Sequence, residues 1–263
     1  MSFIYLDPTI KQHLPSKNTF NEIMQLDGEV FRALEGRATK RISINKKSYF
    51  IKQHKGIGFK EVIKNLLQFK LPIISAKNEY YALLKLQKLN ILVPKVVGFG
   101  IKGFNPAAKQ SFIITKDLQD KISLEDFCKD WEKSSPSYAL KQKLLAKVAN
   151  ISRKMHASGI NHRDFYICHF LFDLQTKDKK EVDLYLIDLH RAGMRKKIPE
   201  RWQIKDLAGL YFSSKNIGLT VRDFLRFITI YSGKPLREIL ATEKVFWMKV
   251  KERGDKLYRK HRH

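Results

Sequence analysis

Two acidic residues, Asp164 and Asp188, have the local sequence context that phosphoryl transfer requires. Asp164 ends the tripeptide His162-Arg163-Asp164 on an irregular segment after a long helical pattern, and Asp188 lies at the end of the apolar strand LYLIDL. One carboxylate can position an acceptor hydroxyl and take its proton, while another holds magnesium on a nucleoside triphosphate. We therefore predict ATP and Mg²⁺ as cofactors, Asp164 as the catalytic residue and Asp188 as a metal ligand.

A kinase of this class also needs a strand lysine for the nucleotide phosphates and a helix glutamate that holds this lysine in place. Lys52 in YFIKQH and Glu79 in a later helical pattern have the expected order and context. Taken alone, each is more typical of a solvated surface residue. Four elements in the expected order favour the kinase interpretation.

Three further residues of the second half of the chain are candidates for supporting roles. His169 stands five positions after Asp164, where a protein kinase usually has a metal-binding asparagine. It could bind the metal or support the loop, because magnesium prefers oxygen ligands. Cys168 has no base beside it, so we expect it to pack rather than react. Asp206 could brace the catalytic loop or serve as a carboxylate at the N-terminus of its helix.

The turn between the first two predicted strands, LEGRATKR, lacks the Gly-x-Gly-x-x-Gly that covers phosphates in protein kinases. Arg37, Thr39 and Arg41 could supply side-chain donors instead, since guanidinium groups bind phosphate oxygens bidentately. Solvated arginines at a turn are an equally good account. Thr115 and Asp117, in SFIITKDL, complete the predicted nucleotide-binding set.

The elements that must position these residues change character along the chain. Three strands are predicted at 28–34, 39–45 and 48–54, with turns at Gly36 and at Lys46-Lys47. A basic amphipathic helix at 59–69, a helix capped by Ser75 and strands at 94–100 and 111–118 follow. The five strands together with these helices predict a small antiparallel lobe over residues 1–118, which we expect to bind the nucleotide.

The second half, residues 119–263, is predicted to be mainly helical and to hold the catalytic and acceptor-binding groups. Apolar residues recur every three or four positions from Leu140 to Met155, and Gly159 is a natural end for that helix. Three more helical patterns lead to a basic tail. The expected fold class is α+β, a bilobal protein-kinase-like fold.

The charge is the most unusual feature of the composition: 51 Lys and Arg against 26 Asp and Glu leave a net charge of +25. This favours a polyanionic partner, such as an anionic membrane, a phosphorylated glycolipid or an acidic protein. No nucleic-acid motif accompanies the charge, so we expect no nucleic-acid partner. The sequence shows neither a signal peptide nor an apolar run of about 18 residues, and two cysteines far apart fit a reducing compartment. We expect a cytoplasmic protein.

Several long segments resemble the lipopolysaccharide core heptose(I) kinase family, from about Leu26 to Leu240. They read GEVFRALEGRATKR, SYFIKQHKG, INHRDFYICHFLF, LIDLHRA, DLAGLYFSS, IGLTVRDFLRF and PLREIL. The resemblance implies ATP-dependent phosphorylation of the first inner-core heptose, on the cytoplasmic side of the inner membrane of a Gram-negative bacterium. It also implies that Asp164 is the catalytic aspartate. Phe165 replaces the cysteine that often follows it in the family.

The resemblance also offers an explanation for the high positive charge, because the lipopolysaccharide core is acidic and embedded among anionic lipids. We expect the helix at 59–69, with Lys60, Lys64 and Lys70, and the tail 249–263 to face the membrane. Two alternatives stay open: a kinase for the 3-deoxy-octulosonic acid of the inner core or for a protein hydroxyl, and a non-catalytic basic binding protein. An acidic protein partner also remains open.

Overall fold

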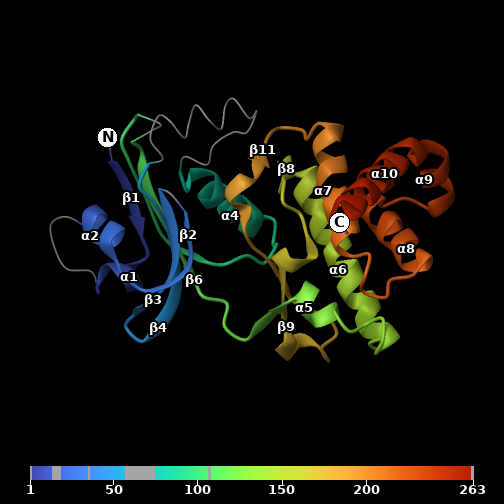
Figure 1. The fold of residues 1–263 in the computed structure, drawn as a ribbon, viewed down its shortest axis with the longest axis horizontal. Helices are drawn as coiled ribbons and strands as arrows, with labels where there is room; N and C mark the ends of the chain where they lie inside the picture. Colours follow the sequence, from blue (N-terminus) through green and yellow to red (C-terminus); the bar gives the residue numbers. More distant parts are fainter. Residues whose placement is uncertain (1, 14–18, 35, 57–74, 106–107, 262–263) are drawn as a thin grey trace. The chain divides into compact units, whose positions relative to one another are not determined.

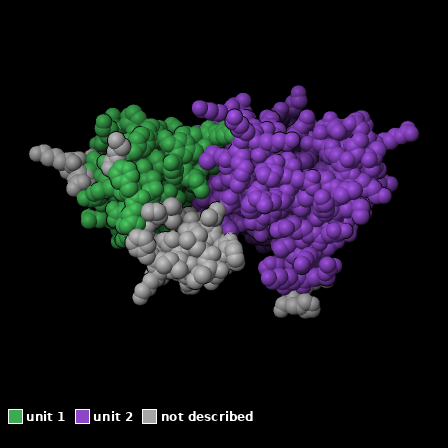
Figure 2. All heavy atoms as spheres, turned by 90° about the horizontal axis from the view of Figure 1, so that it is seen from above, with its two compact units in different colours: residues 1–85, 94–119 green, residues 86–93, 120–263 purple. Residues whose placement is uncertain are grey.

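The computed structural model describes residues 2–13, 19–34, 36–56, 75–105 and 108–261. The chain divides into two compact units, shown in different colours in Figure 2. The first comprises residues 1–85 and 94–119, and the second comprises residues 86–93 and 120–263. The segment 86–93, which the sequence analysis placed in the N-terminal half, belongs to the second unit. There the backbone N–H of Leu186 donates to the carbonyl of Leu92 (2.9 Å).

The first unit is built on an antiparallel sheet whose strand order is β1-β5-β6-β4-β3-β2 (Figure 1). Its strands are β1 (Ser2–Leu6), β2 (Glu29–Leu34), β3 (Arg37–Ile44), β4 (Lys47–His54), β5 (Val96–Lys102) and β6 (Gln110–Lys116). Its described helices are α1 (Pro8–Lys11), α2 (Thr19–Gln25) and α4 (Lys77–Lys88), the last of which continues into the second unit.

The two faces of this sheet carry different side chains, because successive side chains of a strand point to opposite faces. On one face, buried strand residues including Ile42, Ile51 and Phe112 pack against Ile10 of α1 and Phe20 of α2. This apolar cluster forms the core of the unit. The alternate residues of β4 and β3, among them Lys52 and Thr39, occupy the opposite face.

Two details of the first unit differ from the sequence prediction. Strand β1 was not predicted, and it makes a sixth strand by pairing antiparallel with β5. The turn between β3 and β4 is formed by Asn45 and Lys46, one position before the predicted pair. Both residues have positive φ (48° and 57°), which is the requirement of a type I′ hairpin turn and suits asparagine. The predicted helix at 59–69 lies outside the described residues.

The second unit is mainly helical. Its helices are α5 (Leu124–Cys128), α6 (Tyr138–Ala157), α7 (Glu200–Ser213), α8 (Val221–Ser232), α9 (Leu236–Thr242) and α10 (Lys244–His261). Short strands form two small sheets, β10-β9-β7 and β11-β8. They are β7 (Lys121–Ser123), β8 (Ile160–Asn161), β9 (Phe170–Asp173), β10 (Leu184–Leu186) and β11 (Gly193–Met194). Single 3₁₀ turns occur at η1 (Ile167–His169), η2 (Leu174–Thr176) and η3 (Leu189–Arg191).

Helix α6 has the buried apolar face that the sequence predicted, with Leu140, Leu144, Val148, Ile151 and Met155 all buried. It ends at Ala157, and Gly159 follows with φ of +78°. A Cβ at Gly159 would lie 1.8 Å from the carbonyl oxygen of Arg195, so the position requires glycine. This close approach joins the end of α6 to the segment after β11.

After η3 the chain contains four described helices where three helical patterns were predicted, because the basic tail is itself helical, as α10. Helices α7 and α10 pack side by side (Figure 1), with Leu207 and Ala208 of α7 against Val250 of α10. Only one strand was predicted between Asp164 and Asp188, but the structure has two. Phe170–Asp173 forms β9, which pairs antiparallel with β10. In the described part of the chain, no helix has the length and apolarity needed to span a bilayer.

Candidate active site

In the first unit, the structure brings Lys52 and Glu79 together, as predicted. Lys52 lies on β4, where it is paired with Thr39 of β3 and Ile113 of β6. Glu79 lies in the first turn of α4, and its carboxylate is 2.6 Å from Lys52 Nζ. Glu79 is only 4% exposed, and a buried carboxylate is retained at low cost only when it is paired. The pair holds the lysine ammonium at the middle of the sheet.

The strand register places Arg37, Thr39, Arg41 and Thr115 on the same sheet face as Lys52, since residues paired across antiparallel strands share a face. Arg41 has other contacts. Its guanidinium ion-pairs with Glu29 (3.4 Å) and Asp117 (3.2 Å) and lies over the rings of Phe31 and Phe50.

Asp117 is likewise engaged by other side chains. Besides the ion pair with Arg41, its carboxylate accepts a hydrogen bond from Ser48 Oγ (2.7 Å). This network links the ends of β6 and β4 to β3. The nucleotide-binding roles of Arg37, Thr39, Arg41, Thr115 and Asp117 stay predictions.

In the second unit, the His162-Arg163-Asp164 loop is held by the buried carboxylate of Asp206. The backbone N–H of His162 donates to Asp206 Oδ2 (2.6 Å), and that of Arg163 donates to Oδ1 (2.8 Å). Arg163 has φ of +74°, a conformation that is costly for a residue with a side chain and that these hydrogen bonds help to maintain. Asp206 lies within α7, well after its first turn, so the bracing role is the correct one of the two that the sequence left open.

His162 joins the catalytic loop to the strand that carries Asp188. Its Nε2 lies 2.9 Å from the carbonyl oxygen of Ile187, and a carbonyl can only accept, so Nε2 carries the proton. Burial lowers the pKa of His162, which keeps the ring neutral. His162 therefore supports the loop.

Asp164 and Asp188 belong to one connected group of side chains. The carboxylate of Asp164 accepts hydrogen bonds from Arg191 Nη1 at 3.1 and 3.3 Å. His169 Nδ1 donates to the backbone carbonyl of Asp164 (2.6 Å), and its Nε2 lies 3.7 Å from Asp188 Oδ2. The other carboxylate oxygen of Asp188 contacts His190 Nδ1. The carbonyl contact fixes the proton of a neutral His169 on Nδ1, which leaves the Nε2 lone pair facing Asp188.

The residues that flank Asp164 on its C-terminal side are structural. Phe165 is 1% exposed and packs against the rings of His162 and Phe170. Burial raises the pKa of the Cys168 thiol to about 11, so the thiol stays protonated at neutral pH. Neither residue offers a nucleophile, in agreement with the expectation for Cys168.

Sequence reasoning missed Arg191, whose contact with Asp164 depends on the 3₁₀ turn at Leu189–Arg191. Asp188 itself has left-handed backbone angles (φ 62°, ψ 48°), and this bend directs the chain after β10 back toward the catalytic loop. The only available signal was the position of Arg191 three residues after a predicted metal ligand. Among the described residues, no group of three or more His, Cys, Asp and Glu side chains has the arrangement of a metal site.

Known proteins resemble this chain over most of its length. The model of the "Lipopolysaccharide kinase (Kdo/WaaP) family" matches residues 21–231. The chain is 52% identical over 228 residues to the lipopolysaccharide core heptose(I) kinase WaaP of Escherichia coli K12, covering 86% of each chain. It is 42% identical over 258 residues to the protein of the same name from Pseudomonas aeruginosa PAO1, covering 97% of this chain and 96% of that one.

A solved structure described as WaaP in complex with acyl carrier protein superposes with a TM-score of 0.84 at 37% sequence identity, covering 97% of this chain and 99% of that chain. The α+β kinase-like fold predicted from the sequence is thereby confirmed. On the strength of the family match and the full-length relatives, the chain belongs to the lipopolysaccharide kinase (Kdo/WaaP) family.

Proposed function

We propose that this protein transfers the γ-phosphate of ATP to a hydroxyl of the first heptose of the lipopolysaccharide inner core. One observation carries the proposal: His169 contacts both the backbone carbonyl of Asp164 and the carboxylate of Asp188, which places the two acidic residues in one site. Membership of a kinase family implies ATP as the phosphate donor. Heptose as the acceptor is supported by the names of the relatives that are 42–52% identical.

In this mechanism Asp164 orients the acceptor hydroxyl and accepts its proton. The hydroxyl oxygen forms a bond to the γ-phosphorus as the bond between that phosphorus and the β,γ-bridging oxygen breaks, and ADP leaves. Arg191 holds the Asp164 carboxylate in position through its two hydrogen bonds. Asp206 fixes the backbone that carries Asp164.

The residues around Asp188 fit a magnesium ion. The Asp188 side chain is 28% exposed and provides oxygen ligands, which magnesium prefers, and the Nε2 lone pair of His169 faces it. Two acceptors that face one another favour a cation between them, so we assign Asp188, with His169 beside it, to the metal. When bound, Mg²⁺ neutralises charge on the transferred phosphate.

The Lys52–Glu79 pair is assigned to the nucleotide phosphates, with Arg37, Thr39 and Thr115 on the same sheet face as further candidates. Residues 1–118 then serve as the nucleotide-binding lobe and 119–263 as the catalytic and acceptor-binding lobe. Arg41 is already held by its ion pairs with Asp117 and Glu29, so it could contact phosphate only through the guanidinium N–H groups that these pairs do not use. A purely structural role for Arg41 and Asp117 explains their contacts equally well.

The acceptor can be identified by incubating the protein with γ-labelled ATP and truncated lipopolysaccharides of defined length. We expect label on the core that ends in the first heptose and none on the core that ends in 3-deoxy-octulosonic acid. Label on the shorter core would instead identify a kinase for that sugar. Label on neither core, with tight ATP binding, would favour a protein acceptor or a binding protein.

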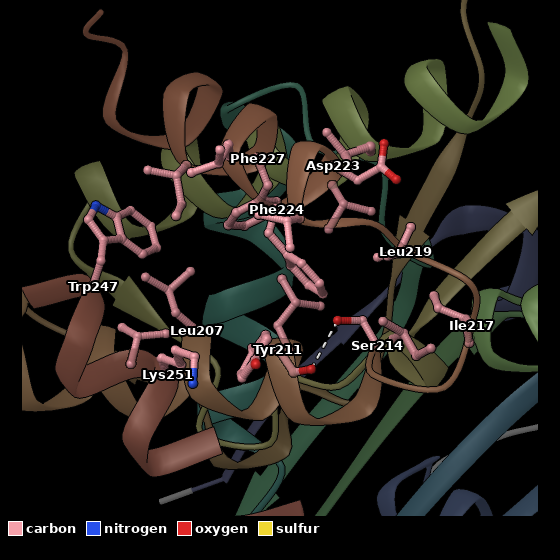
Figure 3. Close-up of a pocket in the computed structure, with 18 of the residues that line it drawn as sticks. Leu207, Tyr211, Ser214, Ile217, Leu219, Asp223, Phe224, Phe227, Trp247 and Lys251 are labelled. Carbon is pink, nitrogen blue, oxygen red and sulfur yellow. Dashed lines mark hydrogen bonds between the residues drawn. The ribbon is translucent and has the colours of Figure 1, made fainter. Parts of the chain in front are cut away.

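We also propose an acidic protein partner, an acyl carrier protein, because that is the partner named for the structural relative. The net charge of +25 complements an acidic surface. The second unit also contains an apolar cavity of about 460 Å³ among α6, α7, α8 and α10, lined by residues that include Leu207, Phe224, Phe227 and Trp247 (Figure 3). A cavity of this size and lining suits an acyl chain.

Three of the residues that line this cavity, Val221, Leu240 and Met248, are apolar and yet at least half exposed to solvent. If an acyl chain enters here, Leu240→Glu is expected to weaken binding of acylated carrier protein about tenfold or more, because it places a charge against the chain. Binding of the unacylated carrier should change little. Isothermal titration with both forms measures this.

Leu174→Glu is the matched control, because Leu174 is also exposed (44%) and does not line the cavity. If both variants weaken binding of the acylated carrier equally, the effect comes from the added negative charge and not from the cavity. Preference of the wild-type protein for the unacylated carrier would contradict the assignment of the cavity.

Finally, we propose a cytoplasmic protein that contacts the inner membrane peripherally. Support comes from α10, whose cations are Lys244, Lys249, Lys251, Arg253, Lys256, Arg259 and Lys260. Vesicle flotation tests this: binding should require anionic lipid and weaken with salt. Equal flotation with neutral vesicles would count against an electrostatic contact.

A further inference from the structure

Four cations of the second unit surround one aromatic ring, that of Trp202 in α7. We call this group the Trp202 cluster. The guanidinium carbons of Arg163, Arg195 and Arg201 lie 4.8, 5.8 and 5.5 Å from the centre of the ring, and Lys205 Nζ lies 5.5 Å from it. Cation–π contacts make such a grouping tolerable but do not neutralise its charge.

The Trp202 cluster has an excess of hydrogen-bond donors. Arg163 Nε and Trp202 Nε1 are buried and have no acceptor in the described part of the chain. The guanidinium of Arg195 donates to a neutral acceptor, Asn161 Oδ1 (2.9 Å). Buried donors are nearly always satisfied in folded proteins, so these two N–H groups are available to an acceptor from outside the described side chains.

The nearby carboxylates are already engaged. Asp206 accepts from the backbone of His162 and Arg163, and the carboxylate of Asp164 accepts from Arg191. Within the described ranges, no carboxylate oxygen comes within ion-pairing distance of Lys205 or of the Arg163 guanidinium. These two side chains therefore make no close ion pair, and Asp164 and Asp206 act on them only from a longer distance.

Burial and mutual repulsion also act on the protonation equilibria of two of these cations. Burial, followed by repulsion from Arg195 and Arg191, lowers the pKa of Arg163. Burial, followed by repulsion from Arg191, also lowers the pKa of Lys205. Half-buried like charges destabilise one another. An anion among them would offset the cost of burying their charge and reduce their mutual repulsion.

The position of the Trp202 cluster indicates which anion it would bind. Arg163 directly precedes Asp164 in the chain, and Lys205 directly precedes Asp206, which accepts from the backbone N–H groups of the catalytic loop. Arg191 acts on both cations and also holds the Asp164 carboxylate. An anion in this cluster would thus lie beside the residue that receives the acceptor hydroxyl.

We propose that three cations of the Trp202 cluster, Arg163, Arg195 and Lys205, bind an anionic group, a carboxylate or a phosphate, of the acceptor glycolipid and so set which hydroxyl reaches Asp164; the exposed Arg201 is not part of this site. The inference rests on the proposed function and deepens it by assigning acceptor-binding residues. Lys205 and Arg195 are specificity-determining residues in this scheme. They hold the acceptor and do not take part in proton or phosphoryl transfer.

The test compares wild type with Lys205→Met, which removes the charge and keeps most of the side-chain volume. With truncated lipopolysaccharide as acceptor, we expect the KM for acceptor to rise about tenfold or more, the usual range for a lost charge-assisted hydrogen bond. The KM for ATP should stay within about twofold. Lys205→Arg should recover most of the affinity because it restores the charge.

Arg201→Gln is the matched control: Arg201 lies over the same ring but is exposed, and its loss should change the KM for acceptor less than about twofold. The assay is repeated with an acceptor whose carboxylates have been reduced and whose phosphates have been removed. With this neutral acceptor, Lys205→Met should behave as wild type.

Several outcomes would overturn the inference. They are an equal effect of Lys205→Met on charged and neutral acceptors, a rise in the KM for ATP in place of the acceptor, or no effect at all in an active protein. A wild type that transfers no phosphate to any core acceptor would instead refute the proposed function. Urea unfolding of each variant separates a change in binding from a loss of fold.

Discussion

Replacing Asp164 with asparagine is expected to lower kcat for phosphoryl transfer by about 10²–10⁴-fold, the usual contribution of a positioned general base. The amide has nearly the same shape but cannot accept the proton of the acceptor hydroxyl. The substitution should cost little stability, because the Asp164 side chain is 21% exposed and its ion pair is with the part-exposed Arg191. Initial rates at saturating ATP and acceptor measure the effect.

Asp178→Asn is the matched control for this variant, since Asp178 is exposed in the same unit and lies outside the site. It removes the same charge and should leave kcat within about twofold. Urea unfolding should give similar free energies for both variants and wild type. A kcat for Asp164→Asn within about threefold of wild type would remove Asp164 from the catalytic role.

Replacing Asp206 with alanine is expected to lower the free energy of unfolding by about 3–5 kcal/mol, the cost of breaking a buried charged network. The carboxylate is completely buried and accepts from the N–H groups of His162 and Arg163, while His156 Nε2 lies 3.3 Å away. Its loss leaves these donors buried without an acceptor, and each costs about 1–3 kcal/mol. Urea denaturation followed by tryptophan fluorescence measures this.

Asp206→Asn separates the loss of charge from the loss of the acceptor. An asparagine oxygen can still accept from one backbone N–H, so we expect this variant to lie between wild type and Asp206→Ala in stability. Both variants should also lose kcat, because the left-handed conformation of Arg163 positions the residue that follows it. A loss of less than about 1 kcal/mol for Asp206→Ala would show that the loop does not depend on this brace.

The parts of the fold that were predicted best are those with a clear local pattern. The apolar repeat of α6 and the alternation in β3 and β4 follow from the periods of helix and strand, which depend only on neighbouring residues. Strand β1 was missed although Phe3, Ile4 and Tyr5 are strong strand formers. Its residues are largely exposed, so it lacks the alternation of buried and exposed positions that identifies a strand.

Some contacts of the candidate site could be predicted from the sequence and others could not. Lys52 and Glu79 could be paired from the order of the elements, and their 2.6 Å contact follows from the register of β4 and the start of α4. Arg191 and the Trp202 cluster could not be found from the sequence. Their contacts join residues that are distant in sequence, through a 3₁₀ turn and a left-handed residue that no local period encodes.

The amino-acid sequence by itself determined the class of chemistry in this protein. The types and order of Lys52, Glu79, Asp164 and Asp188 already indicate phosphoryl transfer, because that reaction needs particular functional groups on particular kinds of element. Only the tertiary structure decided that Asp206 braces the loop, that His169 lies beside Asp188, and that cations gather at Trp202. Hydrogen bonds and charge interactions depend on distances of a few ångströms between segments far apart in the chain, and packing alone sets those distances.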